Sequence, residues 1–133
     1  MTGSAAAVAT SESCSMRVLV CGGRNFSDQQ YLMQYLEALH KCTPITCIIQ
    51  GEAKGADTMA RTWAMLKGVP FASYPAAWHT GRSAGARRNV FMLHDGKPVI
   101  VIAFLGGAGT GHMCKIAEQA GVPLIRTWLE PKK

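Results

Sequence analysis

Four glycine-rich segments hold most of the residues in this sequence that could do chemistry. They read "CGGRNFSD" from Cys21, "GEAKGAD" from Gly51, "PAAWHTGRSAGARRN" from Pro75 and "FLGGAGTGH" from Phe104. Each segment follows an apolar run and leads toward a helix-like segment, and three of them carry a cation. Glycine lets the backbone approach a ligand, and a helix N-terminus offers free N–H groups and a positive dipole end to an anion. We therefore predict a site for the phosphate or ribose of a ligand.

Several arginines in these segments could bind an anion. Arg87 and Arg88 are adjacent at the start of a predicted helix, where a cation is unfavourable, so we expect an anion or acidic neighbour to compensate at least one of them. We expect ligand contact from Arg88 and solvation of Arg87. Arg82 and Arg24 could each clamp a phosphate or remain solvated loop charges.

Asp57, Trp78 and His112 each have a structural and a functional interpretation. Asp57 stands just inside a predicted helix, so it could stabilise that N-terminus or bind ribose hydroxyls. Trp78 could stack on a base or pack under its loop. His112 could bind phosphate or act as an acid or base, although a lone histidine is more often incidental. The other histidines have no metal-ligand spacing, so we expect neither a metal nor a cofactor.

Two common phosphate-binding motifs are absent. The segment "GGAGTG" lacks the G-x-G-x-x-G pattern followed by an acidic residue about twenty positions on. Gly106 and Gly111 have the glycine spacing of a Walker A loop, but His112 replaces its lysine and Met113 its serine or threonine. An NTPase is therefore not expected.

The segments must be positioned by alternating strands and helices. Apolar runs predict five buried strands, at residues 16–21, 45–50, 69–74, 98–104 and 122–127. Helical spacing predicts four helices, within residues 27–41, 54–68, 86–95 and 110–121. In the second helix, Met59, Trp63 and Leu66 are expected on the buried face. We predict an α/β, Rossmann-like three-layer sandwich with a parallel sheet in the order 3-2-1-4-5, and a ligand at the carboxyl ends of strands one and four.

Length and composition indicate one soluble domain. Of 133 residues, 1–15 are expected to form a flexible tail and 16–133 a single domain. The net charge of +6 fits an anionic partner or solubility alone. The five cysteines show no CxxC spacing, which indicates a reducing cytosol. The sequence shows no signal peptide and no apolar run of membrane length, so we expect a cytoplasmic protein without a membrane partner.

The four segments, in this order, resemble the YspA/YpsA-related proteins, the DUF2493 group of the SLOG superfamily. The resemblance covers residues 16–125 and rests on G-x-A-x-G-A-D, a tryptophan, A-G-x-x-R-N-x-x-M and A-F-x-G-G-x-G-T. The superfamily includes LOG-type phosphoribohydrolases, DprA-like DNA-binding proteins and sensors of NAD-derived signalling nucleotides. The resemblance implies a Rossmann-like SLOG domain of bacteria or phages that binds a nucleotide or ADP-ribose-like ligand and often forms homo-oligomers.

The resemblance also implies roles for individual residues. Its motifs fall on the first loop, the second loop, the R-N-x-x-M element and the G-G-x-G-T element, where backbone amides and a threonine hydroxyl would hold a phosphate. The ligand-binding candidates are thus Gly22, Gly23, Arg24, Gly51, Lys54, Gly55, Asp57, Trp78, Arg82, Arg88, Asn89, Gly106, Gly107, Gly109 and Thr110.

One departure from the resemblance concerns catalysis. LOG-type hydrolases carry a glutamate two or three residues after the threonine, whereas Gly111, His112 and Met113 follow Thr110 here. Cleavage of a glycosidic bond usually needs such a carboxylate. The catalytic candidates are Asp57, Glu52 and His112, and none is assigned.

Three hypotheses remain open. The first, which we favour, is a protein that senses or sequesters a nucleotide or an NAD- or ADP-ribose-derived ligand. The second is an N-glycosidic hydrolase or transferase acting on nucleotides, and whether the chain is an enzyme stays undecided. The third is DprA-like nucleic-acid binding, which the absence of a clear basic stripe disfavours.

Overall fold

A five-stranded parallel sheet forms the centre of the molecule. The computed structural model describes residues 15–81 and 83–129. The strands are β1 (Arg17–Cys21), β2 (Cys47–Gln50), β3 (Phe71–Ser73), β4 (Ile100–Ala103) and β5 (Leu124–Arg126). They lie in the order β3-β2-β1-β4-β5, which confirms the predicted topology. All but one residue of the predicted N-terminal tail lies outside the described residues.

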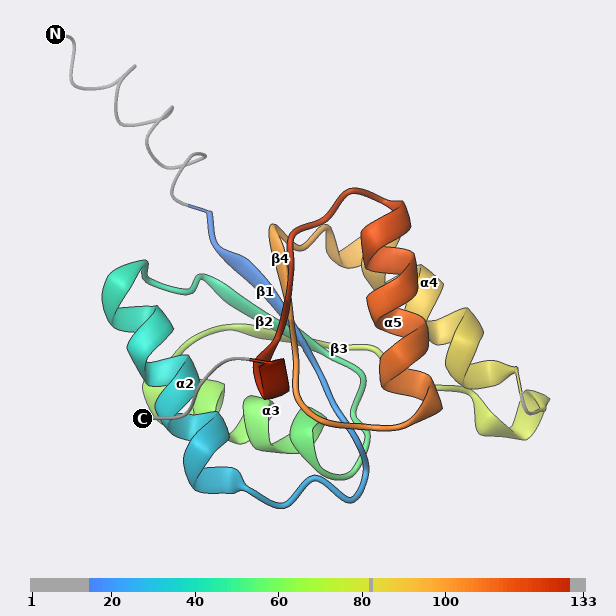
Figure 1. Ribbon diagram of the computed structural model, residues 1–133, viewed down its shortest axis with the longest axis horizontal. Helices are drawn as coiled ribbons and strands as arrows, with labels where there is room; N and C mark the ends of the chain where they lie inside the picture. The colour runs from blue at the N-terminus through green and yellow to red at the C-terminus, as the bar shows by residue number, and fades with distance from the viewer. Residues whose placement is uncertain (1–14, 82, 130–133) are drawn as a thin grey trace, which may run out of the picture.

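Four helices cover the two faces of this sheet. They are α2 (Gln29–Cys42), α3 (Ala56–Lys67), α4 (Ala84–Gly96) and α5 (Ala108–Gln119). Two short 3-10 helices, η1 (Trp78–Thr80) and η2 (Thr127–Leu129), follow β3 and β5. Helices α2 and α3 lie together on one face and α4 and α5 on the other (Figure 1). This is the expected three-layer sandwich.

Alternation along β1 divides the core between the two faces. Val18 and Val20 belong to the apolar cluster beneath α2 and α3, whereas Leu19 and Cys21 belong to the cluster beneath α4 and α5. All four are buried, because a parallel sheet with helices on both sides leaves neither face to solvent. The carboxyl end of β1 is thereby fixed at the centre of the sheet edge.

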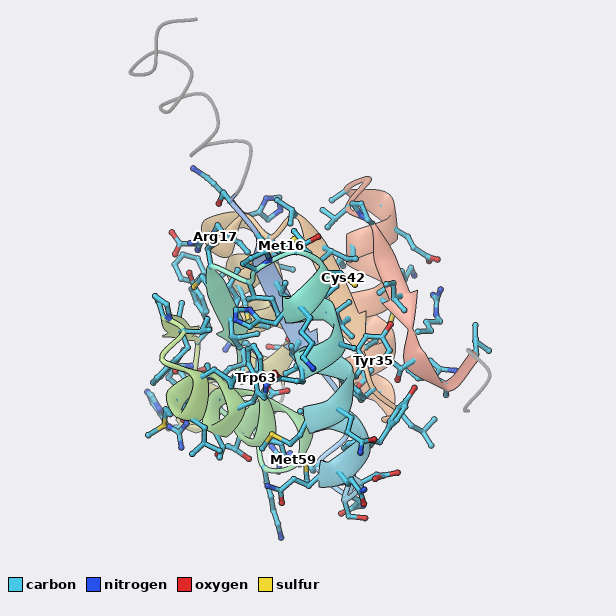
Figure 2. The ribbon with its side chains drawn as sticks, turned by 90° about the vertical axis from the view of Figure 1, so that its left-hand side faces the viewer. Met16, Arg17, Tyr35, Cys42, Met59 and Trp63 are labelled. Carbon is cyan, nitrogen blue, oxygen red and sulfur yellow. The ribbon has the colours of Figure 1, made fainter. Side chains whose placement is uncertain are left out.

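The predicted buried face of α3 is partly wrong. Trp63 is buried beside α2, where its indole Nε1 donates a hydrogen bond to Glu37 at 3.3 Å (Figure 2). Leu66, in contrast, is 75% exposed. The buried stripe runs through Ala56, Ala60, Trp63 and Ala64, and at 100° per residue Leu66 lies about 100° away from its centre.

The ends of α2 and α3 are capped, and the described cysteines form no disulfide. Asp28 caps α2 by accepting a hydrogen bond from the Tyr31 backbone N–H at 3.1 Å, and Gly68 ends α3 in the left-handed conformation. The described cysteines are all free thiols. Within residues 15–81 and 83–129, no helix is long and apolar enough to cross a membrane.

Candidate functional site

A cleft of about 1110 Å³ opens at the carboxyl edge of the sheet, where β1 and β4 lie side by side. Its floor comes from the loop after β1 and from the loop between β4 and α5. Its walls come from the start of α3, from η1 and α4, and from α2 and η2. Every strand of the sheet is therefore followed by a segment that contributes to this cleft.

Most of the predicted site residues that the structure describes line this cleft. They are Gly22, Gly23, Arg24, Asp57, Trp78, Arg88, Asn89, Gly106, Gly107, Gly109 and Thr110, together with His112. Gly51, Glu52, Lys54 and Gly55 do not line it. Arg82 lies outside the described residues.

Two glycines bring the loops after β1 and β4 into backbone contact. The Gly23 N–H donates a hydrogen bond to the Leu105 carbonyl at 3.1 Å. A Cβ on Gly106 would lie 2.5 Å from the Gly23 nitrogen and 2.2 Å from Thr110 Oγ1. A Cβ on Gly23 would lie 2.8 Å from the Gly106 Cα. These two glycines are required by packing within the protein.

Gly55 performs a similar role for the second loop. Its φ of +95° favours glycine, and a Cβ there would lie 2.3 Å from the Gly23 carbonyl oxygen. Gly22 packs so tightly on α3 that an added Cβ would lie 2.5 Å from the Ala56 Cβ. The loops after β1, β2 and β4 thus pack as one unit, although Gly55 itself does not face the cleft.

The start of α5 differs, because its glycines face open space. Around Gly107 and Gly109, no described protein atom lies within 4 Å of the position that a Cβ would occupy. Gly107 caps α5 without a side-chain hydrogen bond, and the first turn has no acidic residue. The exposed amides and positive dipole end can therefore receive an anion.

Thr110 adds a hydroxyl group at the same place. The residue is only 6% exposed yet lines the cleft. Its hydroxyl has no hydrogen-bond partner among residues 15–81 and 83–129. Because this hydroxyl is not among the fully buried atoms without a partner, it is accessible from the cleft and can bond to water or to a ligand oxygen.

Arg88 is held by the protein through most of its donors. Its Nη1 donates to the carbonyl oxygens of Gly51 at 2.6 Å and Tyr74 at 3.1 Å, and its Nε donates to Asn89 Oδ1 at 2.9 Å. Burial lowers the pKa of Arg88 from its ordinary value, and the nearby Asp57 carboxylate opposes this. Arg88 thus joins the ends of β2 and β3 to α4 while its guanidinium also lines the cleft.

Asp57 is a buried carboxyl group beneath the cleft. It is 5% exposed, and its Oδ2 accepts hydrogen bonds from the Gly51 N–H at 3.0 Å and the Ala53 N–H at 3.4 Å. Burial raises its pKa from 3.8 to about 6, and the Arg88 guanidinium partly opposes this rise. Asp57 therefore closes the second loop and also presents a titratable group to the cleft.

The Asn89 amide fixes the state of His112. Arg88 Nε can only donate, so the side-chain oxygen of Asn89 faces Arg88. The side-chain Nδ2 of Asn89 then faces the Gly109 carbonyl at 3.1 Å and His112 Nδ1 at 3.2 Å. His112 Nδ1 must then accept, which leaves the proton of the neutral ring on Nε2. His112 can therefore offer one N–H donor to a ligand.

Arg24 and Trp78 form a pair at the rim. The Arg24 guanidinium lies over the Trp78 ring, 5.2 Å from its centroid. On α4, a Cβ added to Gly85 would lie 2.9 Å from the Trp78 ring. The indole is thus packed on α4 and contacted by a cation, although it is 52% exposed.

Glu52 and Lys54 belong to the second loop but do not line the cleft. Glu52 accepts hydrogen bonds from Arg61 Nη1 at 2.9 and 3.0 Å and from Gln50 Nε2 at 3.2 Å. A hydrogen bond from Ser73 is the main cause that lowers the pKa of Glu52. Lys54 is exposed at the turn before α3. Neither residue lines the cleft, although Ala53 and Asp57 beside them do.

The side of the cleft formed by α2 and η2 was missed by sequence reasoning. Phe26, Tyr31, Thr127 and Trp128 all line it. Thr127 ends the last predicted strand and Trp128 follows it, but they belong to no recognisable motif. A 3-10 turn of three residues is also too short to produce a periodic pattern, so the sequence does not indicate that it lines the cleft. Among the described residues, no group of three or more His, Cys, Asp or Glu side chains is placed to hold a metal ion.

Comparison with known proteins agrees with this architecture. The sequence model of the YspA, cpYpsA-related SLOG family (YAcAr) matches residues 16–81. Gene 61 protein of Mycobacterium phage D29 is 33% identical over 118 residues, which cover 82% of this chain and 94% of that protein.

A solved structure shares the fold. DNA processing protein A (DprA) from Streptococcus pneumoniae superposes with a TM-score of 0.53 at 18% sequence identity. The superposition covers 84% of this chain but 58% of that one, so the chain spans little more than half of the DprA structure. Sequence and fold together show that the chain belongs to the YspA, cpYpsA-related SLOG family.

Proposed function

We propose that this protein binds a phosphate-bearing, nucleotide-derived small molecule in the cleft, and so senses or sequesters it. The observation that carries the proposal is the open start of α5. There Gly107 and Gly109 face empty space, and the Thr110 hydroxyl has no partner among the described residues. A phosphate placed there accepts hydrogen bonds from backbone amides and from Thr110.

The charges around the cleft support an anionic ligand. Among the residues that the structure describes, two basic side chains line the cleft, Arg24 and Arg88. Two cations at a focused site suit one or two phosphate groups. Family membership favours the same class, since SLOG proteins are associated with nucleotide-related ligands.

The size of the cleft supports a ligand larger than inorganic phosphate. Its volume of about 1110 Å³ slightly exceeds the range of ordinary small-molecule sites, which span about 300–1,000 Å³. We infer an NAD- or ADP-ribose-derived molecule, which combines a diphosphate with two ribose-bearing groups.

A ligand screen with a matched pair of glycine variants tests the proposal. Thermal shift and calorimetry are measured with AMP, NAD, ADP-ribose and inorganic phosphate. At least one nucleotide should raise the melting temperature, because a ligand that binds only the folded state stabilises it. Gly109→Ala should weaken binding by about tenfold or more, since its methyl group occupies the space of the phosphate.

Gly111→Ala is the control for this variant. Gly111 lies in the same helix, also has no described atom within 4 Å of its Cβ position, and does not line the cleft. It should leave ligand affinity unchanged. If no anionic nucleotide binds, or if both alanine variants bind equally well, the assignment of the phosphate to α5 is wrong.

Asp57 supports a second candidate function, cleavage of an N-glycosidic bond. Its carboxyl group lines the cleft, and burial raises its pKa to about 6, which suits a group that exchanges a proton near neutral pH. Chromatography of AMP or NAD incubated with the protein tests this alternative. Release of free base that Asp57→Asn abolishes, while that variant still binds the ligand, would support it, whereas recovery of intact ligand from a protein that binds it would exclude it.

A further inference from the structure

We propose that Trp128, and not Trp78, is the residue on which the planar base of the ligand stacks. The proposal rests on the function proposed above and adds to it the position of the base. With the phosphate at the start of α5, the base would lie between that helix end and η2. Trp128 would then be a specificity-determining residue that contributes affinity only for ligands with a base.

The backbone that carries Trp128 is fixed beside the phosphate site. The Thr127 hydroxyl donates to the Ala103 carbonyl at 3.0 Å, and the Thr127 carbonyl accepts from the Tyr31 hydroxyl at 3.1 Å. Thr127 is buried, and its bond to Ala103 is buried with it, whereas the bond from Tyr31 is part-buried. Because Ala103 ends β4, the turn is attached directly to the strand that leads into the G-G-x-G-T loop.

The indole of Trp128 has a free surface. Trp128 is 38% exposed and lines the cleft. Within the described part of the chain, no aromatic ring or cation stacks on it. An exposed indole face on a fixed backbone is the usual platform for a base, because every base has a π face that can stack on it.

The Trp78 indole is 52% exposed, but a cation already covers its ring. The Arg24 guanidinium lies 5.2 Å above its ring, and Gly85 lies against the ring on α4. A base that stacked on Trp78 would compete with Arg24 for the same indole. The structure therefore favours a different tryptophan from the one that the sequence suggested.

The wall behind Trp128 is apolar and well packed. Phe26 and Tyr31 line this side of the cleft, and their rings contact Phe104 with centroid separations of 5.4 and 6.0 Å. Phe104 is fully buried. These rings give this side of the cleft an apolar surface, which suits the planar face of a base. In Figure 1, η2 is the short dark-red turn between α2 and β4.

Phosphorylated ligands with and without a base provide the test. Dissociation constants of the whole protein are measured for the four nucleoside 5′-monophosphates and for ribose 5-phosphate. The wild type should bind its preferred monophosphate roughly 5- to 100-fold more tightly than ribose 5-phosphate, the range expected for one stacked base. Trp128→Ala should remove most of this ratio and leave the affinity for ribose 5-phosphate unchanged.

Three further variants make the result decisive. Trp128→Phe keeps an aromatic face and should retain part of the ratio. Leu129→Ala changes an exposed neighbour that does not line the cleft, and it should change neither affinity. Trp78→Ala should leave the ratio intact.

The possible failures are distinguishable. If Trp128→Ala keeps the ratio, or if Trp78→Ala removes it, the stacking assignment is overturned while the phosphate site stands. If the wild type binds both kinds of ligand with equal affinity, no base subsite exists. If it binds neither kind, the proposed function is wrong and the subsite falls with it.

Discussion

Asp57 and Arg88 each combine a structural role with a place in the cleft. Both groups meet at Gly51, where an added Cβ would lie 2.3 Å from Arg88 Nη1 and 2.9 Å from Asp57 Oδ2. The Gly51 N–H donates to Asp57 while its carbonyl accepts from Arg88. A substitution of either charged residue therefore changes the loop as well as the ligand site, and activity alone cannot separate the two roles.

The titration of Asp57 gives a separate measurement at this scale. Its pKa is 3.8 in the unfolded chain and about 6 in the folded one, so the folded state holds the proton more tightly. Its contribution to stability is fully present below about pH 4 and is lost as the pH rises through 6. The loss is on the order of 3 kcal/mol.

Asp57→Asn does not titrate and isolates this contribution. The unfolding free energy of the wild type minus that of Asp57→Asn should fall by on the order of 3 kcal/mol between pH 4 and pH 7. Urea denaturation of both proteins at several pH values measures the difference. A difference that stays constant with pH would show that Asp57 titrates alike in both states.

Among the elements, the first turn of α5 and the loops beside it depend on glycines of two kinds. Gly23 and Gly106 allow two loops to touch, whereas Gly109 and Gly111 have open space around them. The two kinds look alike in the sequence, since all four lie in or near glycine-rich segments. Only the packing of the folded chain distinguishes a glycine needed for contact from one that leaves room.

Alanine should therefore destabilise the protein at a glycine needed for loop contact, but not at a glycine with open space around it. Gly106→Ala places a Cβ within 3 Å of Thr110 and Gly23, and should destabilise the fold by about 1–3 kcal/mol. Gly111→Ala, inside α5, should leave stability unchanged or raise it by up to about 1 kcal/mol. Denaturant midpoints and m-values of both variants measure this contrast, and equal losses would refute the packing assigned to Gly106.

The elements that the sequence predicts well are those with a strong periodic signal. All five strands and four helices lie within or close to their predicted ranges, because buried parallel strands are continuous apolar runs. All five predicted strands are one to three residues too long in total, because mostly apolar residues flank the paired core. Given the order β3-β2-β1-β4-β5, right-handed crossovers place α2 and α3 on one face of the sheet and α4 and α5 on the other (Figure 1).

What the sequence did not reveal depends on long-range contact. Trp128 lies in a turn of three residues that is positioned by bonds to Tyr31 and Ala103, far away in the chain. Arg88 binds carbonyl groups of two loops that its own helix does not reveal. The sequence indicated the chemistry of the site, but it could not show which polar groups are satisfied by the protein and which are left for a ligand.

At the scale of the whole molecule, the net charge of +6 has to be weighed against its distribution. Within the described chain, Arg24 and Arg88 are the lysine or arginine residues that line the cleft. Other cations, such as Arg61 and Lys67, form ion pairs with Glu52 and Glu37. This distribution favours a small anion over a polyanion.

Salt dependence distinguishes these two kinds of ligand. A single-stranded oligonucleotide held by the two cleft arginines should show a slope of about −1.4 in log K against log salt. A slope several times steeper would mean that cations elsewhere on the surface also bind phosphates, and it would favour the nucleic-acid hypothesis. Fluorescence anisotropy at several salt concentrations gives this slope, with AMP as the small-ligand reference.

The cleft joins segments that are widely separated along the chain, as the contacts of Gly23 with Gly106 and of Tyr31 with Thr127 show. Contacts across such long loops tend to form late, after the transition state of folding. A ligand that bridges them should therefore act as a kinetic lock: it should slow unfolding while leaving the refolding rate nearly unchanged. In stopped-flow experiments with saturating ligand, only the unfolding limb of the chevron should shift, and a matching acceleration of refolding would show that the cleft forms early.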